Sequence, residues 1–455
     1  MKPGIPKGTR DFSAAELAKR NYIFETLKKS FQLFGFEPIE TPSFENSGTL
    51  LGKYGEEGDR LIFKILNSGD FLKKVDDSTL AEKDSVKISS KITEKALRYD
   101  LTVPFARYVV QHQNEITFPF KRYQIQPVWR ADRPQKGRFR EFFQCDADVV
   151  GSDSLWQEVE FVQLYDDVFS KLGLRDTVIK INNRKILTGI AELIGAGDKL
   201  IDFTVALDKL DKIGTEGVLS EMRSKGITDV ALEKLKPLFE LKGDNASQLS
   251  ALSELLKDSK EGLKGIGELR FVIEQVEKMG LRTSKLSLDL TLARGLNYYT
   301  GAILEVQAAG VDMGSIGGGG RYDDLTGIFG LKGISGVGIS FGLDRIYLVM
   351  EELGLFENTP NPAPQVLFIN FGASEAAYAM KTLVVLREQG ISSELYPSSV
   401  KLKKQMTYAN NRRIPFVVLV GEEEIQKETF QLKNMSTGEQ LACNQEELIR
   451  LINGS

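Results

Sequence analysis

The chain has 455 residues, 42% hydrophobic and 27% charged, a globular balance that allows about three domains. Two cysteines and one histidine exclude a disulfide framework and a multi-histidine metal site, so we assign no metal-ligating residues. The formal net charge of −4 means that any nucleic acid must bind at local basic patches. Without a signal peptide or an apolar run of ~20 residues, we expect a cytoplasmic protein that does not span a membrane.

The N-terminal part of the chain predicts a helix over residues 13–34. Ser13 and Glu16 have the spacing of a capping box at its start. Four apolar residues recur at helical spacing and should face the core: Phe24, Leu27, Phe31 and Phe34. Prolines make residues 36–42 extended, and the polar residues 67–95 should form a surface loop.

The only histidine, His112, stands at the end of another predicted helix. This setting favours a surface residue over a catalytic base. Any chemistry should therefore depend on arginines, carboxylates and backbone groups.

Residues 120–130 and 138–149 predict two strands of an antiparallel hairpin with a polar loop between them. One face of the hairpin is apolar and the other polar, because side chains alternate along a strand. The polar face carries Arg122, Gln124, Gln126, Arg130, Arg138, Arg140, Phe142, Gln144, Asp146 and Asp148. A solvated outer face would explain simple alternation. The mixture of arginines, a phenylalanine, amides and paired acids instead favours a ligand-binding floor, with Arg for phosphate and Phe for stacking.

The middle of the chain predicts a helical insertion over residues 175–285, rich in Leu, Lys and Glu. Strands should return at 286–292 and 301–307. The four glycines at 317–320 suit the close approach of backbone to a ligand, with a flexible turn as the alternative.

A strand at 336–341 should lead into a helix that begins at Gly342. Arg345 lies near the start of this helix and could hold a phosphate together with Arg130, although a solvated arginine is the simpler explanation. The sequence has no Gly-x-x-x-x-Gly-Lys-Ser/Thr, so any nucleotide is not bound by a P-loop.

The tail after Asn361 alternates strands and helices, which predicts a small α/β domain with a largely parallel sheet. The expected strands are 366–371, 391–395 and 415–420, and the expected helices are 373–389 and 401–413. The second helix is basic, and a solvated face and an RNA contact explain this equally well.

These segments resemble the three signature motifs of class II aminoacyl-tRNA synthetases, in order. The segment from Phe36 to Glu45 resembles motif 1, Trp129 to Phe142 resembles motif 2, and Gly338 to Arg345 resembles motif 3. Four further segments are similar to those of histidyl-tRNA synthetases: residues 97–102, 133–138, 292–301 and 318–323. Asn297 departs from the usual Asp, and Asp100, Asp132 and Asp148 stand where many bacterial members carry Glu.

The resemblance implies an α+β fold. It comprises an antiparallel-sheet catalytic domain with a helical insertion and a C-terminal α/β anticodon-binding domain. The boundaries that we predict are 1–174 and 286–358 for the two parts of the catalytic domain, 175–285 for the insertion, and 361–455 for the anticodon-binding domain. A homodimer is also implied.

The resemblance further implies a reaction and its residues. ATP and Mg²⁺ would activate L-histidine to the adenylate, which is then transferred to the 3′ end of tRNA(His). Catalysis would rest on Arg130 and Arg294. The other roles would be ATP binding by Arg130, Asp132, Arg138, Phe142 and Arg345; histidine binding by Asp100, Thr102, Gln144, Asp148, Arg294, Tyr298, Tyr299 and Tyr322; and tRNA binding by Arg133, Gln135, Lys403, Lys404, Arg412 and Arg413.

Two alternatives remain open. A non-catalytic regulatory relative in histidine biosynthesis would typically lack the tail and the catalytic arginines, which this chain keeps. A class II synthetase for another amino acid is disfavoured by the segment from Arg294 to Thr300.

Overall fold

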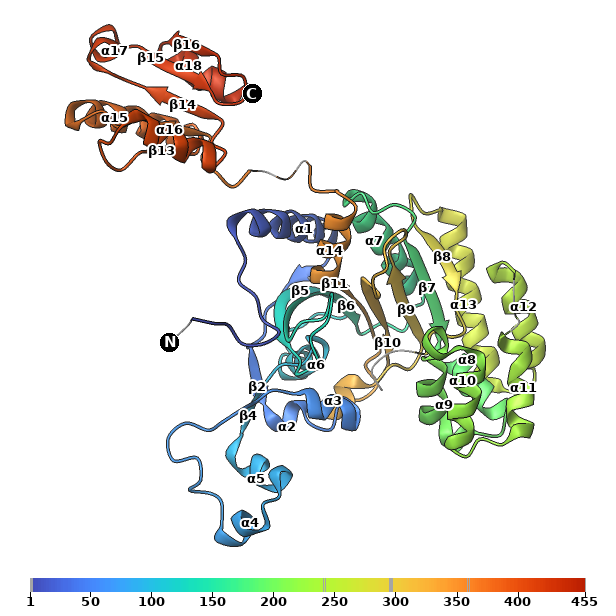
Figure 1. The fold of residues 1–455 in the computed structure, drawn as a ribbon. Helices are drawn as coiled ribbons and strands as arrows, with labels where there is room; N and C mark the ends of the chain where they lie inside the picture. The colour runs from blue at the N-terminus through green and yellow to red at the C-terminus, as the bar shows by residue number, and fades with distance from the viewer. Residues whose placement is uncertain are drawn as a thin grey trace. The chain divides into compact units, whose positions relative to one another are not determined.

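The structure is a computed structural model that describes residues 3–239, 241, 243–293, 298–357, 359 and 361–454. The chain forms two compact units, residues 1–359 and residues 360–455. Each unit has its own sheet and its own hydrophobic core (Figure 1). None of the described helices is long and apolar enough to cross a membrane.

An eight-stranded, mostly antiparallel sheet forms the centre of the first unit. Its strands in spatial order are β1 (Glu37–Pro38), β5 (Phe120–Trp129), β6 (Glu141–Val150), β11 (Gly336–Gly342), β10 (Gly317–Tyr322), β9 (Ala302–Gln307), β7 (Val178–Asn183) and β8 (Lys285–Leu288). Only the two outermost pairs, β1 with β5 and β7 with β8, are parallel. The α+β prediction is confirmed.

The apolar face of the hairpin is covered by helix α1 (Ala14–Leu33), which contacts α7 (Trp156–Lys171) and α14 (Leu343–Glu352). Ser13 and Glu16 form the predicted capping box of α1. Phe31 is fully buried, and its ring centroid lies 5.2 Å from that of Tyr123 and 5.8 Å from that of Phe341. The predicted stripe of α1 therefore packs directly on the sheet.

The hairpin of β5 and β6 is antiparallel, as predicted. Its register places Gln124 opposite Asp146 and Arg122 opposite Asp148. Arg122 and Gln124 are fully buried, and Asp148 is 3% exposed, so the solvated-face explanation is wrong. The second strand starts at Glu141 rather than 138, because residues 135 and 138 bond to each other across a tight turn.

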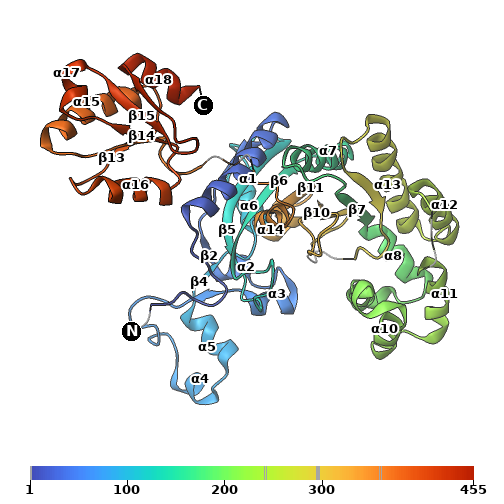
Figure 2. The same ribbon diagram turned by 45° about the horizontal axis from the view of Figure 1, so that its top comes forward.

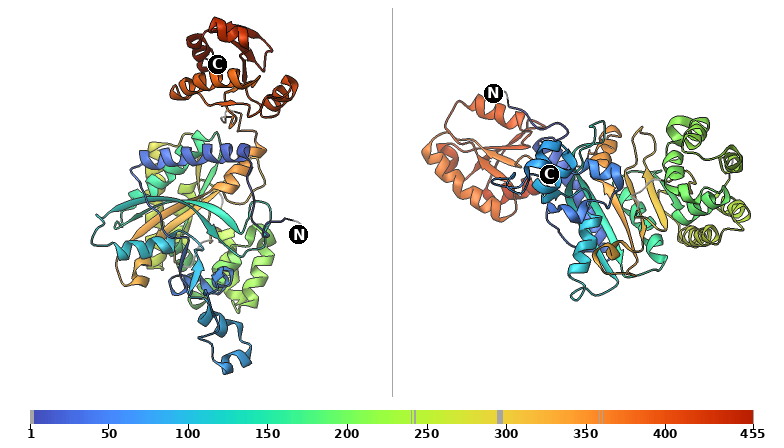
Figure 3. Two further views of the ribbon diagram at one scale, coloured as in Figure 1. Left: turned by 90° about the vertical axis from the view of Figure 1, so that its left-hand side faces the viewer. Right: turned by 90° about the horizontal axis from the view of Figure 1, so that it is seen from below.

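The helical part of the first unit lies between β7 and β8. Its helices are α8 (Arg184–Leu193), the 3-10 helix η1 (Gly197–Lys199), α9 (Leu200–Leu207), α10 (Leu210–Ser224), α11 (Asp229–Phe239), α12 (Asn245–Leu255) and α13 (Lys260–Met279). They gather beside the β7–β8 edge of the sheet (Figures 2 and 3). Helices α8 and α13 pack closely where glycine faces glycine. A Cβ atom on Gly189 would lie only 2.7 Å from the Cα of Gly262, so a larger residue would not fit there.

The prediction of a loop over residues 67–95 is wrong. Two short helices, α4 (Asp77–Glu82) and α5 (Ser85–Ile92), lie in this segment, capped by Asp76 and Asp84. Neither helix has a buried residue, and they are only six and eight residues long. They lie in the chain between β3 (Lys64–Ile65) and β4 (Lys95–Leu97), which form a small sheet with β2 (Phe44–Asn46). The helices α2 (Ser47–Leu50) and α3 (Gly55–Leu61) connect β2 to β3.

The glycine run is neither a turn nor a loop. It forms most of strand β10, which pairs with β9 on one side and β11 on the other. A Cβ atom on Gly319 would lie 2.2 Å from the carbonyl oxygen of Gly338, so this pairing requires glycine there. A 3-10 helix, η2 (Leu325–Phe329), follows β10, and α6 (Thr102–Gln111) contacts it.

The second unit has a five-stranded sheet. Its strands in spatial order are β13 (Ser393–Leu395), β12 (Val366–Phe368), β14 (Phe416–Leu419), β15 (Phe430–Asn434) and β16 (Gln440–Cys443), and its helices are α15 (Ala373–Glu388), α16 (Leu402–Asn411), α17 (Glu422–Lys427) and α18 (Gln445–Asn453). The first three strands are parallel, as predicted, whereas β15 and β16 are antiparallel additions. The helix that we predicted over 401–413 is shorter: α16 ends at Asn411, so Arg412 and Arg413 lie beyond its end.

Candidate active site

A cavity of about 150 Å³ lies against the polar face of the hairpin. The described residues that we predicted to bind histidine all line it: Asp100, Thr102, Gln144, Asp148, Tyr298, Tyr299 and Tyr322. The remaining predicted residue, Arg294, lies outside the described part of the chain, as does Asn297. Segments far apart in sequence thus converge on one small enclosure.

A second pocket, of about 680 Å³, shares Arg130, Gln144 and Ser340 with this cavity. All the residues that we predicted to bind ATP line it: Arg130, Asp132, Arg138, Phe142 and Arg345. The sequence did not predict that Ile201 and Val205 of α9 also line this pocket. Both are at least half exposed, so the helical part supplies an apolar wall.

Arg130 lies where the two cavities meet. Its Nε donates to the carbonyl oxygen of Tyr99 at 3.0 Å, and its Nη2 donates to Oε1 of Gln144 at 3.3 Å. The guanidinium carbon lies 4.3 Å from the ring centroid of Tyr99 and 5.2 Å from that of Phe142. These contacts fix the direction of a side chain that has five N–H donors, so it can present further donors to a ligand.

Arg345 ties the motif 3 helix to the motif 2 turn. Its Nε donates to the carbonyl oxygen of Gly137 at 3.0 Å, and its Nη1 donates to that of Ser315 at 2.7 Å. Gly137 has a φ of 71°, which favours glycine, and a Cβ atom there would lie 2.8 Å from Sδ of Met313. These hydrogen bonds therefore fix the position of the Arg345 side chain in the wall of the larger pocket.

Asp344, beside Arg345, accepts hydrogen bonds from three segments of the chain, a role that the sequence did not predict. Its carboxylate accepts from Arg10 and from Arg20, the latter at 2.6 Å. It also accepts the backbone N–H of Phe143 at 3.3 Å. Asp344 thereby joins the N-terminal segment, α1, β6 and α14 at the wall of the larger pocket.

Asp148 is held from two sides. The hydroxyl of Tyr322 donates to Oδ1 at 2.6 Å, and Nη2 of Arg122 lies 2.8 Å from Oδ2. Burial raises the pKa of Asp148, and the neighbouring Arg122 acts in the opposite direction. Its carboxylate packs over Gly338, where a Cβ atom would lie 1.9 Å from Oδ1. Glycine at this point of β11 is therefore required for the position of Asp148.

Asp100 precedes α6 and lies on another wall of the same cavity. Its Oδ1 accepts from the hydroxyl of Tyr54 at 2.8 Å and from the backbone N–H of Val103 at 3.2 Å. Its Oδ2 accepts from the hydroxyl of Tyr298 at 3.4 Å. Burial raises the pKa of Asp100. Tyr54 is a site residue that no sequence pattern indicated.

Asp146 also lines the cavity, although we had placed it only on the polar face of the strand. It is 2% exposed, and burial raises its pKa to about 7, with Arg122 opposing and Asp148 adding to the shift. The alternation along β6 predicted its face, but not that it would reach the cavity.

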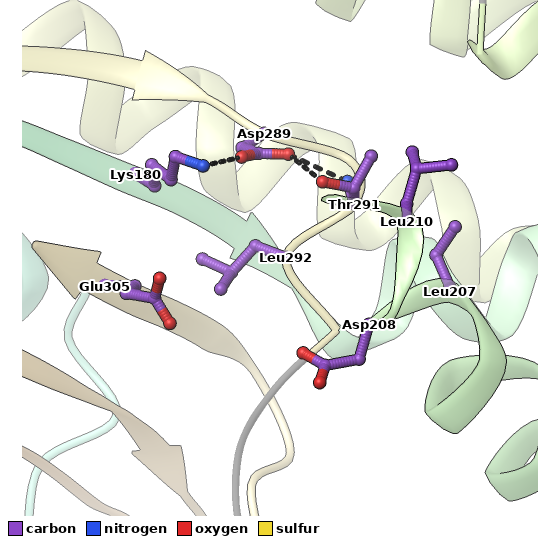
Figure 4. A pocket seen from close by; sticks show the side chains of 8 residues that line it. All are labelled: Lys180, Leu207, Asp208, Leu210, Asp289, Thr291, Leu292 and Glu305. Carbon is purple, nitrogen blue, oxygen red and sulfur yellow. Dashed lines mark hydrogen bonds and ion pairs between the residues drawn. The ribbon is translucent and has the colours of Figure 1, made fainter. Parts of the chain in front are cut away.

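Figure 4 shows a third, much smaller pocket, of about 10 Å³. Asp289 is engaged there by Lys180 at 2.8 Å and by the hydroxyl of Thr291 at 2.6 Å. Asp208 and Glu305 line both this pocket and the larger one. The volume suits about one water molecule. In the part of the chain that the structure describes, no group of three or more acidic, histidine or cysteine residues could hold a metal.

The residues that we predicted to contact tRNA lie on two surfaces. Arg133 and Gln135 are exposed on the turn between β5 and β6. In the second unit, Lys403, Lys404 and Arg413 are exposed. Arg412 is engaged by Glu394 of β13 at 2.9 Å and lies over the ring of Tyr408. His112 caps the end of α6 at the surface, with its Nδ1 2.9 Å from Glu115.

Comparison with known proteins agrees with this geometry. Residues 70–346 match the family model for histidyl-tRNA synthetase, and residues 365–454 match that for an anticodon binding domain. The histidine–tRNA ligase of Christiangramia forsetii is 71% identical over 441 residues, which cover 97% of each chain. This chain belongs to the histidyl-tRNA synthetase family. The prediction of an aminoacyl-tRNA synthetase that loads histidine is confirmed.

Other relatives support the same assignment. The histidine–tRNA ligase of Flavobacterium johnsoniae is 64% identical, covering 100% of this chain and 99% of that one. The solved histidyl-tRNA synthetase of Nostoc sp. PCC 7120 has a TM-score of 0.83 at 31% identity, covering 100% of this chain and 99% of that chain. An ATP phosphoribosyltransferase regulatory subunit/histidyl-tRNA synthetase from Bacillus halodurans C shares the fold alone, with a TM-score of 0.72 at 20% identity, covering 90% and 97% of the two chains.

Proposed function

We propose that histidine is activated in the cavity of about 150 Å³ by ATP bound in the adjoining pocket of about 680 Å³. The single observation that carries this proposal is the shared wall at Arg130 and Gln144. A substrate carboxylate at this junction would meet the α-phosphate of a nucleotide on the other side. The histidyl group then passes to the 3′ end of tRNA(His).

The chemistry needs charge stabilisation more than a base. An oxygen of the histidine carboxylate forms a bond to the α-phosphorus of ATP, the bond to the β-phosphate oxygen breaks, and pyrophosphate leaves. A ribose hydroxyl of the tRNA then attacks the acyl carbon, and AMP leaves. Arg130 and Arg294 would stabilise the charge at the α-phosphoryl group. Arg345 would hold the γ-phosphate, and Phe142 would stack under adenine.

Histidine itself would be recognised at both ends. Asp100, Thr102 and Gln144 offer oxygen acceptors for the three donors of the α-ammonium group. Asp148 and Tyr299 would face the ring nitrogens, with Tyr322 holding Asp148 at 2.6 Å. The burial of these groups supports a selective site, because an ill-fitting ligand would leave them unpaired.

Use of ATP by this family implies Mg²⁺ as well. Mg²⁺ typically binds through one or two carboxylates plus the phosphates of the substrate. Glu305 is 7% exposed and lines the larger pocket together with Asp208, so the chain fits this mode of binding. We propose Glu305 as the carboxylate that holds the ion. When bound, Mg²⁺ would neutralise the β- and γ-phosphate oxygens.

Exchange of pyrophosphate with ATP, measured with each standard amino acid in turn, tests the function. Only histidine is expected to support exchange. A regulatory binding protein would support none, and a synthetase of other specificity would respond to another amino acid.

The two units should divide the labour. All described residues assigned to ATP and histidine lie in residues 1–359, and the second unit has a separate core. Deleting residues 361–455 should therefore reduce tRNA charging at least about tenfold more than pyrophosphate exchange, because RNA affinity depends on placed basic residues. A folded truncated protein that loses both activities equally would contradict this division.

We also propose that the chain is a homodimer. Strand β1, in motif 1, is an edge of the main sheet, and the exposed apolar residues nearby in sequence include Leu33 at 74% and Phe44 at 48%. A dimer about a two-fold axis would bury the same patch of both subunits, which would cover these apolar side chains and this edge. Light scattering at micromolar concentration should give twice the mass of one chain, whereas the mass of one chain alone would refute the proposal.

The cytoplasm remains the compartment that we propose. Cys145 and Cys443 are both free and buried. Unpaired thiols of this kind are common where the surroundings are reducing.

A further inference from the structure

Asp146 is the aspartate of the histidine cavity to which the proposed function gives no role. Its Oδ1 lies 3.5 Å from Nε2 of Gln144, a marginal hydrogen bond, and it accepts from the hydroxyl of Ser340. In the register of the sheet it stands between Gln124 of β5 and Ser340 of β11. Its neighbours across the sheet are therefore neutral.

The other two aspartates are differently placed. Asp148 has Arg122 as its counter-charge at 2.8 Å. Asp100 lies where the α-ammonium group of histidine is expected. Within the described residues, no basic side chain forms an ion pair with Asp146. Burial raises the pKa of Asp146 to about 7, so a carboxylate there is costly until a cation arrives.

The titratable groups that influence Asp146 come from several elements. They are Asp148 and Cys145 of β6, Arg122 of β5, Asp100 ahead of α6, Tyr299 ahead of β9 and Tyr165 of α7. Arg122 is the one basic member of this set, and it already pairs with Asp148. Among the described residues that line the cavity, Arg130 is the one basic side chain against three aspartates, and it is bonded to Tyr99 and Gln144 rather than to Asp146.

We infer that Asp146 is a second carboxylate for the histidine ring and that the cavity binds the ring as the imidazolium cation. This inference rests on the proposed function and deepens it by naming the protonation state of the substrate. An imidazolium has two N–H donors. Asp148 would accept one of them, and Asp146 would accept the other, on the side of the ring that Tyr299 also faces. The cation also supplies the charge that Asp146 lacks.

The test compares histidine with 2-fluoro-L-histidine in pyrophosphate exchange at pH 7. Fluorine withdraws electron density, so this ring keeps nearly the same shape but stays neutral. In the unaltered protein, KM should be about tenfold or more higher for the fluorinated substrate, because hydrogen bonds to charged groups are stronger. In Asp146→Asn the ratio of the two KM values should fall to about threefold or less, mainly through a higher KM for histidine.

Two variants serve as controls. Asp146→Glu retains the charge and should keep most of the discrimination. Asp176→Asn makes the same chemical change at an exposed position that lines neither cavity and should keep the full ratio. Because each ratio compares two substrates in one sample, a partly unfolded preparation does not alter it.

The inference would be overturned if the KM values for 2-fluoro-L-histidine and histidine were nearly equal in the unaltered protein. It would also be overturned if their ratio were the same in Asp146→Asn as in the unaltered protein. Either result would leave histidine activation intact. Absence of any histidine-dependent exchange in the unaltered protein would instead overturn the proposed function.

Discussion

Arg130→Ala is expected to lower kcat for pyrophosphate exchange by about 10²–10³, the typical effect of losing one donor aimed at developing charge. The side chain is anchored to Tyr99 and Gln144 at the junction of the two cavities. Such a fixed arginine acts mainly on the transition state, so the KM values for ATP and histidine should rise much less than kcat falls. Steady-state exchange kinetics at varied ATP and histidine concentrations give kcat and the two KM values.

Two further variants sharpen this measurement. Arg130→Lys keeps the charge but loses the planar fork, and should still lose at least about tenfold in kcat. Arg175→Ala removes an exposed arginine that lines neither cavity and should behave as the unaltered protein does. Near-normal kcat with a greatly raised KM for ATP in Arg130→Ala would assign Arg130 to ground-state binding instead.

Asp148→Asn is expected to raise the KM for histidine about tenfold to a hundredfold, since a buried polar group left unpaired costs about 1–3 kcal/mol. The KM for ATP should change little, because Asp148 does not line the larger pocket. The variant should also be less stable. Arg122 is fully buried and would lose its counter-charge, and breaking a buried ion pair costs about 3–5 kcal/mol.

Thermal unfolding of Asp148→Asn separates these two effects. A lower Tm is expected, and exchange is then assayed well below it so that the protein is folded. Unchanged Tm together with unchanged KM for histidine would mean that Asp148 neither reads the ring nor balances Arg122.

The sequence predicted the floor of the site well, because a hairpin with period-two alternation puts alternate residues on one face. Asp146 and Asp148 were therefore placed on the same face as Gln144. The pairing of Asp148 with Arg122 could not be predicted, because it depends on the register between β5 and β6. The alternation also cannot tell which of two aspartates has a counter-charge.

Other parts of the site arise from contacts between distant segments. Tyr54 reaches Asp100 from the short helical region before β3, where no periodic pattern points to it. Ile201 and Val205 line the larger pocket from helix α9, whose sequence is apolar on nearly every side and does not show which apolar residues face a ligand. Helices α4 and α5 were missed because they are only six and eight residues long and lie in a polar segment, where only their capping aspartates marked them.

The most direct test of the two-cavity account is a crystal structure with L-histidine and an ATP analogue whose α,β bridge cannot be cleaved. The account predicts the imidazole within hydrogen-bond distance of Asp148 and Tyr299, adenine on Phe142, and the histidine carboxylate beside Arg130. An imidazole outside the cavity of about 150 Å³, or a nucleotide outside the pocket that Arg345 lines, would contradict it.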